Sequence, residues 1–416
     1  MIESCAGDNR HLRIALITTE LAVGGAEQCL ARLAIGLARR GFEPAVYSLL
    51  PPPAAPRDRL VQQLAAANLP LHFLGLRRAI QFRQGVAQLA ELLERQHPDL
   101  IQSFLFHANI LATFATRRLR RRTRSAPKAL ETRPTNHFEA AASSWSPATK
   151  LVTGWRVADQ RPCRARLEAR LTRQVDHVVC VSRSVAEQAR RLGMPTSRLS
   201  VIPNGVDLSL FSSEQAFPQD ASSQLALPTP ATNSLPPTLL AIGRLDPQKG
   251  FDWLLQGASR LLAELPGFRL VIVGEGPERT RLAARIRAAG LEDRVELPGW
   301  QNDIPRRLQS ATLVLIPSRW EGMPNVLLEA MASGRAVVAT RVEGVEELLG
   351  PEAAPQTASA FDLDEFVDRA ITLARNPNER HRLGAANADR VRERFSIDTM
   401  IDTYAALYAR LCHGES

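Results

Sequence analysis

Two carboxylates stand eight positions apart in the segment P-S-R-W-E-G-M-P-N-V-L-L-E-A-M-A-S-G, residues 317–334. They are Glu321 and Glu329, separated by a Gly-Met-Pro turn and the start of an apolar helical pattern. The apolar run before them predicts a buried strand. Free backbone N–H groups and the helix dipole at the start of the helix favour a phosphate group. Glu329 falls more than one turn inside the helix, where its carboxylate can accept hydrogen bonds from a pair of hydroxyls.

Two cations follow another apolar strand in A-I-G-R-L-D-P-Q-K-G, residues 241–250. Arginine can grip two oxygens at once, while lysine acts as a mobile point charge, so Arg244 and Lys249 suit a diphosphate. The alternative is two surface cations on a loop. The acidic segment 317–334 favours the interpretation as a ligand site, because ligands of open α/β sheets bind at strand ends.

Two glycine turns carry weaker signals. Gly24 and Gly25 follow the first strand and would let a ligand approach the backbone closely, although a flexible turn explains them equally well. A full G-x-G-x-x-G is absent there, which argues against a nicotinamide dinucleotide site. The segment V-G-E-G-P-E-R, residues 273–279, indicates a strand-to-helix turn whose backbone is a lesser candidate for lining a nucleotide pocket.

One histidine lies just past a strand end, in S-F-L-F-H-A-N. A lone histidine such as His107 is more often structural than catalytic, yet reacting groups collect in strand-end loops. His137 is a weaker candidate, because it can simply cap a loop.

The composition favours a two-domain protein of the reducing cytoplasm. A length of 416 residues is enough for two domains, and 45% of the residues are hydrophobic. No apolar run is long enough to span a membrane, and the N-terminus lacks the pattern of a secretory signal. Five scattered cysteines without a C-x-x-C pair argue against a zinc site or a disulfide framework.

The positive charge is concentrated in the first half of the chain. Residues 1–220 hold 30 lysines and arginines against 18 acidic residues, although the whole chain has a net charge of only +9. This half should face an anionic partner such as acidic lipid headgroups, a phosphorylated acceptor or nucleic acid. The densest basic cluster is R-R-L-R-R-R-T-R, from Arg117 to Arg124, for which a solvated helix face is the alternative.

Alternating apolar strands and helical patterns predict a parallel sheet covered on both faces in each half. The expected strands include residues 12–20 and 238–243, and Ser182 is expected to cap a helix that begins near Arg183. Residues 212–237 are rich in Ser, Pro, Gln and Ala and predict a linker or flexible loop. The chain therefore divides into residues 1–211, the linker, residues 238–395, and a helix over 396–416 that packs back on the first domain.

Together these segments resemble the retaining, nucleotide-sugar-dependent glycosyltransferases of family 4, which have the GT-B fold. The resemblance rests on E-G-M-P-N-V-L-L-E, G-R-L-D-P-Q-K-G, V-I-P-N-G-V-D, V-G-E-G-P-E-R and the early G-G-A-E. It implies two doubly wound, Rossmann-like domains that face each other across a cleft, the first on the acceptor side and the second binding the donor.

The resemblance also implies roles for particular residues. Arg244 and Lys249 would hold the donor diphosphate, Glu329 the ribose hydroxyls, and Glu321 would face the transferred sugar. His107 would lie near that sugar as a second catalytic residue. The remaining donor contacts would come from the glycine turn and a helix N-terminus, through Gly25, Asn325 and Val326.

In such enzymes catalysis is mostly orientation and electrostatic stabilisation, because the leaving phosphate itself helps to take the acceptor proton. Neither a metal nor another cofactor is expected, since protein cations neutralise the leaving diphosphate. The family usually has two adjacent glycines after the strand R-A-V-V-A-T, and here Glu343 replaces the first of them. We expect this loop to pack differently without abolishing donor binding.

The predicted function is sugar transfer from a nucleotide diphosphate sugar, with UDP favoured over GDP, to a polysaccharide, glycolipid or similar acceptor. The predicted location is the cytoplasm, in contact with the anionic inner face of the cell membrane. A nucleotide-sugar epimerase of the same fold and a non-catalytic binding protein for anionic lipid or nucleic acid are the alternatives. The arginine cluster contains no interleaved aromatic residues, so specific nucleic-acid binding is not expected.

Overall fold

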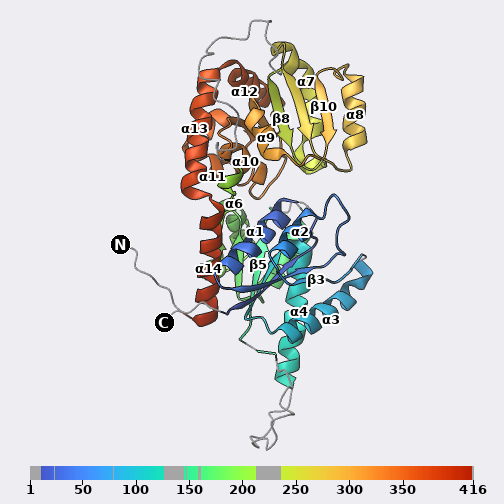
Figure 1. Ribbon diagram of the computed structural model, residues 1–416, viewed down its shortest axis with the longest axis vertical. Helices are drawn as coiled ribbons and strands as arrows, with labels where there is room; N and C mark the ends of the chain where they lie inside the picture. The colour runs from blue at the N-terminus through green and yellow to red at the C-terminus, as the bar shows by residue number, and fades with distance from the viewer. Residues whose placement is uncertain are drawn as a thin grey trace, which may run out of the picture. The chain divides into compact units, whose positions relative to one another are not determined.

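The computed structural model describes residues 11–22, 24–77, 79–125, 145–146, 148–157, 161–211 and 236–414 (Figure 1). His137 and nearly all of the expected linker, residues 212–235, lie outside the described residues. The chain forms two compact units. Unit 1 comprises Met1–Pro203 and Asp398–Ser416, and unit 2 comprises Asn204–Ile397.

Unit 1 is a seven-stranded sheet with helices on both faces. Its strands are parallel and lie in the order β3-β2-β1-β4-β5-β6-β7. Its elements, in chain order, are β1 Arg13–Thr18, α1 Gly25–Arg39, β2 Glu43–Ser48, α2 Arg59–Ala66, β3 Leu71–Phe73, α3 Phe82–Gln96, β4 Leu100–Phe104, α4 Phe106–Ser125, β5 Lys150–Trp155, α5 Pro162–Thr172, β6 His177–Cys180, α6 Arg183–Arg191 and β7 Leu199–Val201.

The last helix of the chain, α14 (Ile397–His413), also belongs to unit 1. Its Tyr404 and Tyr408 are fully buried, and Ile401 packs so closely on α1 that a Cβ at Gly36 would lie 2.2 Å from it. Arg40, just after α1, forms ion pairs with α14 residues Asp398 and Asp402 at 3.1 and 2.6 Å. Both apolar burial and charge therefore hold α14 on unit 1.

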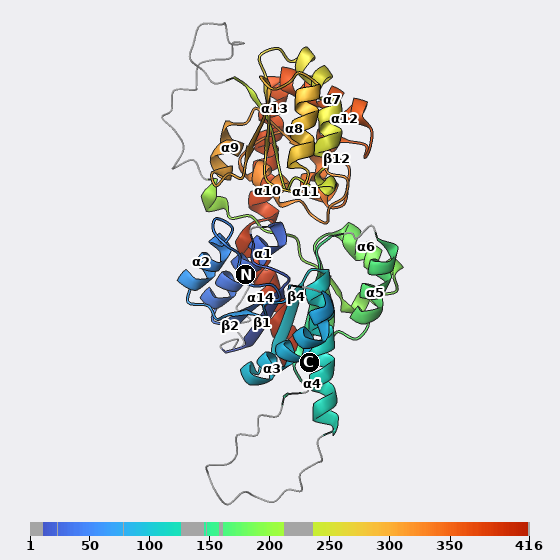
Figure 2. The same cartoon turned by 90° about the vertical axis from the view of Figure 1, so that its right-hand side faces the viewer.

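Unit 2 is a second, six-stranded parallel sheet, in the order β10-β9-β8-β11-β12-β13. Helices α7, α8 and α12 cover one face and enclose a continuous apolar core (Figure 2). The elements are β8 Thr238–Ile242, α7 Phe251–Glu264, β9 Arg269–Val273, α8 Arg279–Ala288, β10 Val295–Gly299, α9 Ile304–Ser310, β11 Leu313–Ile316, α10 Asn325–Ala332, β12 Val337–Thr340, α11 Val345–Leu349, β13 Thr357–Ala358, α12 Leu363–Arg375 and α13 Pro377–Arg394.

The structure confirms the two strands and the helix cap that were predicted by residue number. The apolar runs at 12–20 and 238–243 form β1 and β8. The hydroxyl of Ser182 caps α6 by accepting a hydrogen bond from the Val185 N–H at 3.3 Å. The structure assigns residues 204–211 to unit 2, whereas the sequence placed them in the first domain. The reason is local: Val206 bridges to Ser396, which follows α13.

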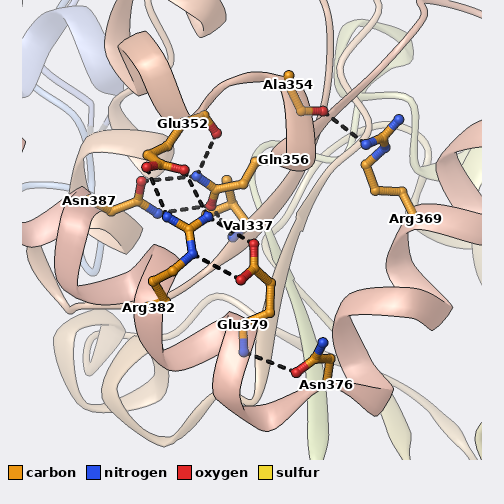
Figure 3. A network of polar contacts seen from close by, with 9 residues as sticks. All are labelled: Val337, Glu352, Ala354, Gln356, Arg369, Asn376, Glu379, Arg382 and Asn387. Carbon is orange, nitrogen blue, oxygen red and sulfur yellow. Dashed lines mark hydrogen bonds and ion pairs between the residues drawn. The ribbon is translucent and has the colours of Figure 1, made fainter.

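A buried pair of amides joins α13 to the sheet of unit 2 (Figure 3). Gln356 and Asn387 are 0% and 1% exposed and exchange two hydrogen bonds, at 3.0 and 2.9 Å. The side-chain oxygen of Gln356, Oε1, also accepts a hydrogen bond from the backbone N–H of Val337 in β12, at 3.0 Å. At the surface nearby, Arg382 forms ion pairs with Glu352 and Glu379.

We expect Gln356→Leu to lower the free energy of unfolding by about 2–3 kcal/mol, because it leaves several buried polar groups without partners. Arg382→Ala is the matched control, and it should have a much smaller effect because exposed ion pairs contribute little. Urea denaturation with an unchanged m-value measures both. Equal destabilisation by the two variants would contradict the importance of the buried amide pair.

Candidate active site

In each unit the predicted site residues follow two adjacent strands at which the strand order reverses. In unit 2 these strands are β8 and β11, since β9 and β10 lie on one side of the pair and β12 and β13 on the other. Ligands of open parallel sheets bind beyond the carboxyl ends of such strands. Arg244 and Lys249 follow β8, and Glu321 follows β11. The topology thus brings together two segments that the sequence analysis had joined only by inference.

The centre of this site is an ion pair between Lys249 and Glu321. The Nζ of Lys249 lies 2.5 Å from Glu321 Oε1, and the Ser318 hydroxyl donates to the same oxygen at 2.7 Å. The side chain of Glu321 is only 7% exposed and that of Lys249 is 20% exposed. A carboxylate this buried needs its charged partner, so the pair fixes both groups at the strand ends.

The two loops approach each other too closely for any side chain at Gly250. Its φ is +67°, and a Cβ there would lie 1.9 Å from the carbonyl oxygen of Pro317. Glycine alone tolerates both the left-handed backbone and this approach. The contact brings the end of the β8 loop against the start of the β11 loop, and it thereby sets the distance between Lys249 and Glu321.

Arg319 joins the same two loops, and the sequence analysis assigned it no role. Its guanidinium donates to the carbonyl of Pro247 at 2.5 Å and to the carboxylate of Asp252 at 3.0 Å. Burial alone would raise the pKa of Asp252, but the hydrogen bond and charge of Arg319 outweigh it and hold this pKa below its ordinary value. Arg319 therefore serves as a structural cation of the site.

Arg244 lies apart from the ion pair. Its side chain is 67% exposed, and its guanidinium donates to the carboxylate of Asp246. Within the described residues, no contact joins Arg244 to Lys249 or Glu321. A long exposed side chain with one surface partner is free to turn toward an anion at low energetic cost.

The remaining predicted residues of unit 2 lie on α10. This helix begins at Asn325, so the backbone N–H groups of Asn325 and Val326 lie in its first turn. Both residues and Glu329, one turn further on, are half-buried. The side chain of Asn204, in the motif I-P-N-G-V-D, donates to Asn325 Oδ1 at 2.6 Å and to the carbonyl of Met323 at 3.2 Å. Asn204 therefore holds the turn that leads into α10.

Glu343, which replaces a family glycine, binds the site directly. Its Oε2 accepts a hydrogen bond from the backbone N–H of Glu321 at 3.1 Å. The next residue, Gly344, has a φ of +77°, and a Cβ there would lie 2.4 Å from the carbonyl oxygen of Gly322. The loop after β12 thus packs on the turn that contains Glu321. The carboxylate of Glu343 provides the hydrogen-bond acceptor for one backbone N–H group of that turn.

We expect Glu343→Ala to lower the free energy of unfolding by about 1 kcal/mol, because it leaves the Glu321 N–H without its carboxylate partner. Glu343→Gln is the matched control, since its amide oxygen can accept the same hydrogen bond and should restore most of the loss. Chemical denaturation compares the two variants. Identical values for Glu343→Ala and the unchanged protein would mean that this hydrogen bond does not stabilise the turn.

In unit 1 the strand order reverses between β1 and β4. Gly25 opens α1 after β1, and the Glu27 carboxylate lies so close that a Cβ at Gly24 would meet it at 2.3 Å. His107 lies in the first turn of α4 after β4. Leu105, between β4 and α4, has a φ of +72°, which is unusual for a residue with a branched side chain. The topology places Gly25 and His107 just after the ends of the neighbouring strands β1 and β4.

His107 is exposed and stands beside a cation. Its Nε2 lies 3.5 Å from Arg164, whose guanidinium packs 4.0 Å over the ring of Phe106. Partial removal of the imidazole from water and the charge of Arg164 lower the pKa of His107. The ring is therefore predominantly neutral near pH 7, with one nitrogen that can accept a hydrogen bond. The neighbouring Asn109 is buried and bonded to Ser103 and Glu168, so its role is structural.

The part of the chain that the structure describes contains no group of three or more His, Cys, Asp or Glu side chains arranged to hold a metal ion. Among the same described residues, no helix combines the length and the apolar character needed to cross a membrane.

Both halves of the chain match known sequence families. The family described as Glycosyltransferase Family 4 matches residues 23–210, and the one described as Glycosyl transferases group 1 matches residues 236–376. The first match contains Gly25 and His107, and the second contains every predicted site residue of unit 2. The two matches therefore divide the candidate residues as the two units do.

Curated relatives span much of the chain. The lipopolysaccharide core biosynthesis mannosyltransferase LpsB of Rhizobium meliloti (strain 1021) is 31% identical over 251 residues, which is 58% of this chain and 67% of that protein. The UDP-Gal:alpha-D-GlcNAc-diphosphoundecaprenol alpha-1,3-galactosyltransferase of Escherichia coli is 27% identical over 297 residues, 71% of each protein. Among the first five curated relatives, the match spans between 46% and 74% of the relative's own length.

A solved structure matches the fold over nearly the whole chain. The complex of Anabaena Alr3699/HepE with UDP and glucose has a TM-score of 0.74 at 19% identity. It covers 96% of this chain and 100% of that one. At this identity the match concerns the fold alone, and it confirms the prediction of two doubly wound domains of the GT-B type.

Proposed function

The chain belongs to the family 4 glycosyltransferases of GT-B type, and we propose that it is a retaining enzyme that uses a nucleotide diphosphate sugar. The favoured donor is a UDP-sugar, with a GDP-sugar as the second choice. The acceptor is a growing polysaccharide or a glycolipid of the kind used in lipopolysaccharide assembly. The names of the curated relatives and the UDP complex of the structural neighbour support this choice.

The observation that carries the proposal is the ion pair of Lys249 and Glu321 at the point where the strand order reverses in unit 2. Such a point binds nucleotides in doubly wound sheets. A lysine held there by a carboxylate supplies positive charge to a diphosphate, while the carboxylate offers an oxygen to sugar hydroxyls. Neither group alone would be stable in so buried a place, which explains why they occur together.

The other site residues receive roles from the same proposal. The N–H groups of Asn325 and Val326 bind a phosphate oxygen at the start of α10, and Glu329 binds the ribose hydroxyls. Arg244 turns from Asp246 toward the diphosphate when the donor is present. In unit 1, Gly25 binds the donor phosphate through its backbone, and His107 binds the transferred sugar through its neutral ring.

The proposed chemistry needs no protein nucleophile. The bond from the anomeric carbon to the diphosphate breaks as the acceptor oxygen approaches from the same face, and the leaving phosphate takes the acceptor proton. Lys249 and Arg244 stabilise the charge that grows on the diphosphate. Glu321 and His107 orient the sugar while its positive charge develops. Neutralisation of the leaving group by these cations is the role that a metal ion plays in other transferases.

We place the enzyme in the cytoplasm, with the basic first half of the chain against the anionic face of the cell membrane. An acceptor linked to lipid would bring its reactive hydroxyl to that surface. Binding to vesicles at low salt tests this part of the proposal, because attraction between exposed charges weakens as salt is added.

A thermal-shift comparison of UDP-, GDP- and ADP-sugars tests the donor. A ligand present at about 100 times its dissociation constant should stabilise the protein by roughly 2.7 kcal/mol. The preferred donor is then incubated with and without a glycolipid acceptor. Product with an unchanged anomeric configuration supports the proposal. No shift with any donor would contradict it, and turnover without acceptor to give an epimer would identify an epimerase instead.

A further inference from the structure

The C-terminal half of α4 carries the arginine cluster, and its arginines differ in their partners. Arg120 donates to the carbonyl of Thr149 at 3.0 Å and to Asp176 at 2.6 Å. Arg122 pairs with Glu94 of α3 at 3.2 Å. No hydrogen bond or ion pair is made by the side chain of either Arg117 or Arg121 within the described residues. These two stand four positions apart, so their like charges repel on one face of the helix.

These two arginines line a cavity of about 440 Å³, a volume within the range of small-molecule sites. Its wall is formed by the helix, by β5 and by the turn after α5, through Thr113, Thr116, Arg117, Arg120, Arg121, Leu151 and Gln174. Apart from Leu151, every lining residue carries a hydrogen-bonding or charged side chain. The carboxylate of Asp176, which pairs with the lining residue Arg120, also accepts from the backbone N–H of Leu151 at 2.8 Å.

Thr116 lines the cavity, and its hydroxyl differs from those of the neighbouring threonines on α4. Threonines in helices commonly donate to the carbonyl four residues earlier, as Thr113 does to Asn109 at 2.7 Å and Thr123 to Leu119 at 3.0 Å. Thr116 is 1% exposed, and its hydroxyl has no hydrogen-bond partner. A buried hydroxyl without a partner is unfavourable, but this one is closed off from the cavity, so the case for an anion rests on the cationic lining.

The cavity lies at the opposite edge of the sheet from His107. Arg120 bonds to Thr149 and Asp176, which precede the first residues of β5 and β6, whereas His107 follows the last residue of β4. From His107 to Arg120 the helix rises by about 20 Å. A ligand in this cavity therefore cannot take part in chemistry at the strand ends that carry His107.

We propose that this cavity is a second anion site that binds a phosphate group and is separate from the site of sugar transfer. Arg117 and Arg121 would bind the phosphate oxygens through charge-assisted hydrogen bonds, and the exposed Gln174 would donate a neutral one. Binding would relieve the repulsion between the two arginines. The phosphate can belong to a soluble phosphate compound or to a phosphomonoester lipid headgroup, because both present the same three oxygens.

The test uses the full chain, the double variant Arg117→Gln/Arg121→Gln, and a matched control, Arg118→Gln/Arg166→Gln. The control also removes two exposed positive charges from α4 and α5 but leaves the cavity unchanged. Calorimetric titration with inorganic phosphate and pyrophosphate forms one arm. Co-sedimentation at low salt with phosphatidylcholine vesicles, with and without phosphatidic acid, forms the other.

We expect the double variant to bind the preferred probe about a hundredfold more weakly, with the control close to the unchanged protein, because each lost charged hydrogen bond weakens binding about tenfold. Loss in the phosphate arm identifies a soluble ligand, and loss only with phosphatidic acid identifies a lipid headgroup. Equally weakened probe binding in the double variant and the control would indicate nonspecific charge attraction and would contradict the proposed site. Absence of binding in both arms would overturn it as well. Sugar transfer by the double variant in detergent solution should stay unchanged.

Discussion

Replacement of Lys249 by alanine is expected to slow sugar transfer by about 10²–10³-fold, which corresponds to roughly 2.7–4 kcal/mol of transition-state stabilisation. The proposed cause is loss of the cation that meets the charge growing on the leaving diphosphate. The loss is larger than for an exposed lysine, because Lys249 is held in place by the buried carboxylate of Glu321 and acts without reorganisation.

Steady-state rates at saturating donor measure this effect, after correction for the folded fraction taken from an unfolding curve. The correction matters because Lys249→Ala also leaves Glu321 buried without its partner. Arg260→Ala serves as the control, since Arg260 forms exposed ion pairs with Asp364 and Asp368. A Lys249→Ala protein that is folded and fully active would refute the assignment of Lys249 to the diphosphate.

Replacement of Gly250 by alanine is expected to lower the free energy of unfolding by about 3–5 kcal/mol. Two penalties combine there: a side chain in the left-handed region, and a Cβ that would lie 1.9 Å from a backbone oxygen of Pro317. Backbone cannot move aside as a flexible side chain can, so the two loops must separate. The Lys249–Glu321 pair should then loosen, and the transfer rate should fall together with the stability.

Gly267→Ala separates the two penalties. Gly267 has a φ of +86°, but a Cβ there would have no neighbour within 4 Å. Gly267→Ala should therefore lower the free energy of unfolding only by the cost of the left-handed backbone, about 1 kcal/mol. Denaturant midpoints with equal m-values give the comparison. Equal losses for Gly250→Ala and Gly267→Ala would show that the close approach of the loops contributes nothing to stability.

The strands that border the site were predictable because a parallel sheet covered on both faces makes each strand a continuous apolar run. The ends of β8 and β11 are visible for that reason, and with them the residues that follow. Other strands were missed. Strand β13 has two residues, β10 ends in Pro-Gly, and β5 contains Gly154, where a Cβ would lie 3.0 Å from the Ser103 carbonyl. Such segments pair because of their neighbours, and their own pattern is weak.

The ion pair between Lys249 and Glu321 could not be predicted from the sequence. Lys249 and Glu321 are 72 positions apart, and their contact depends on the approach of Gly250 to Pro317. No local sequence pattern predicts that two backbone segments so far apart in the chain come this close together. Arg319 was missed for a related reason. It stands inside the most informative segment, but its partners are Pro247 in the loop after β8 and Asp252 in the first turn of α7, so its role appears only once the chain has folded.

The glycine replaced by Glu343 shows the limit of reasoning from resemblance. The sequence analysis expected a different packing of this loop, and the structure supplies the form it takes. The carboxylate accepts the N–H of Glu321, while Gly344 preserves the close contact with Gly322. The hydrogen bond made by Glu343 appears only in the structure, since the motif indicates no partner for this carboxylate.

The placement of α14 has a consequence for how the chain is made. Unit 1 is synthesised first, yet Tyr404 and Tyr408 of its core arrive last, after the whole of unit 2. At typical elongation rates of 5–20 residues per second, the nascent first unit would wait on the order of 10–40 s for its final helix. During that time the surface of α1 around Gly36, and the buried thiol of Cys29 that meets Met400, would be uncovered on the ribosome. The order of synthesis thus makes the complete folding of unit 1 depend on the completion of unit 2.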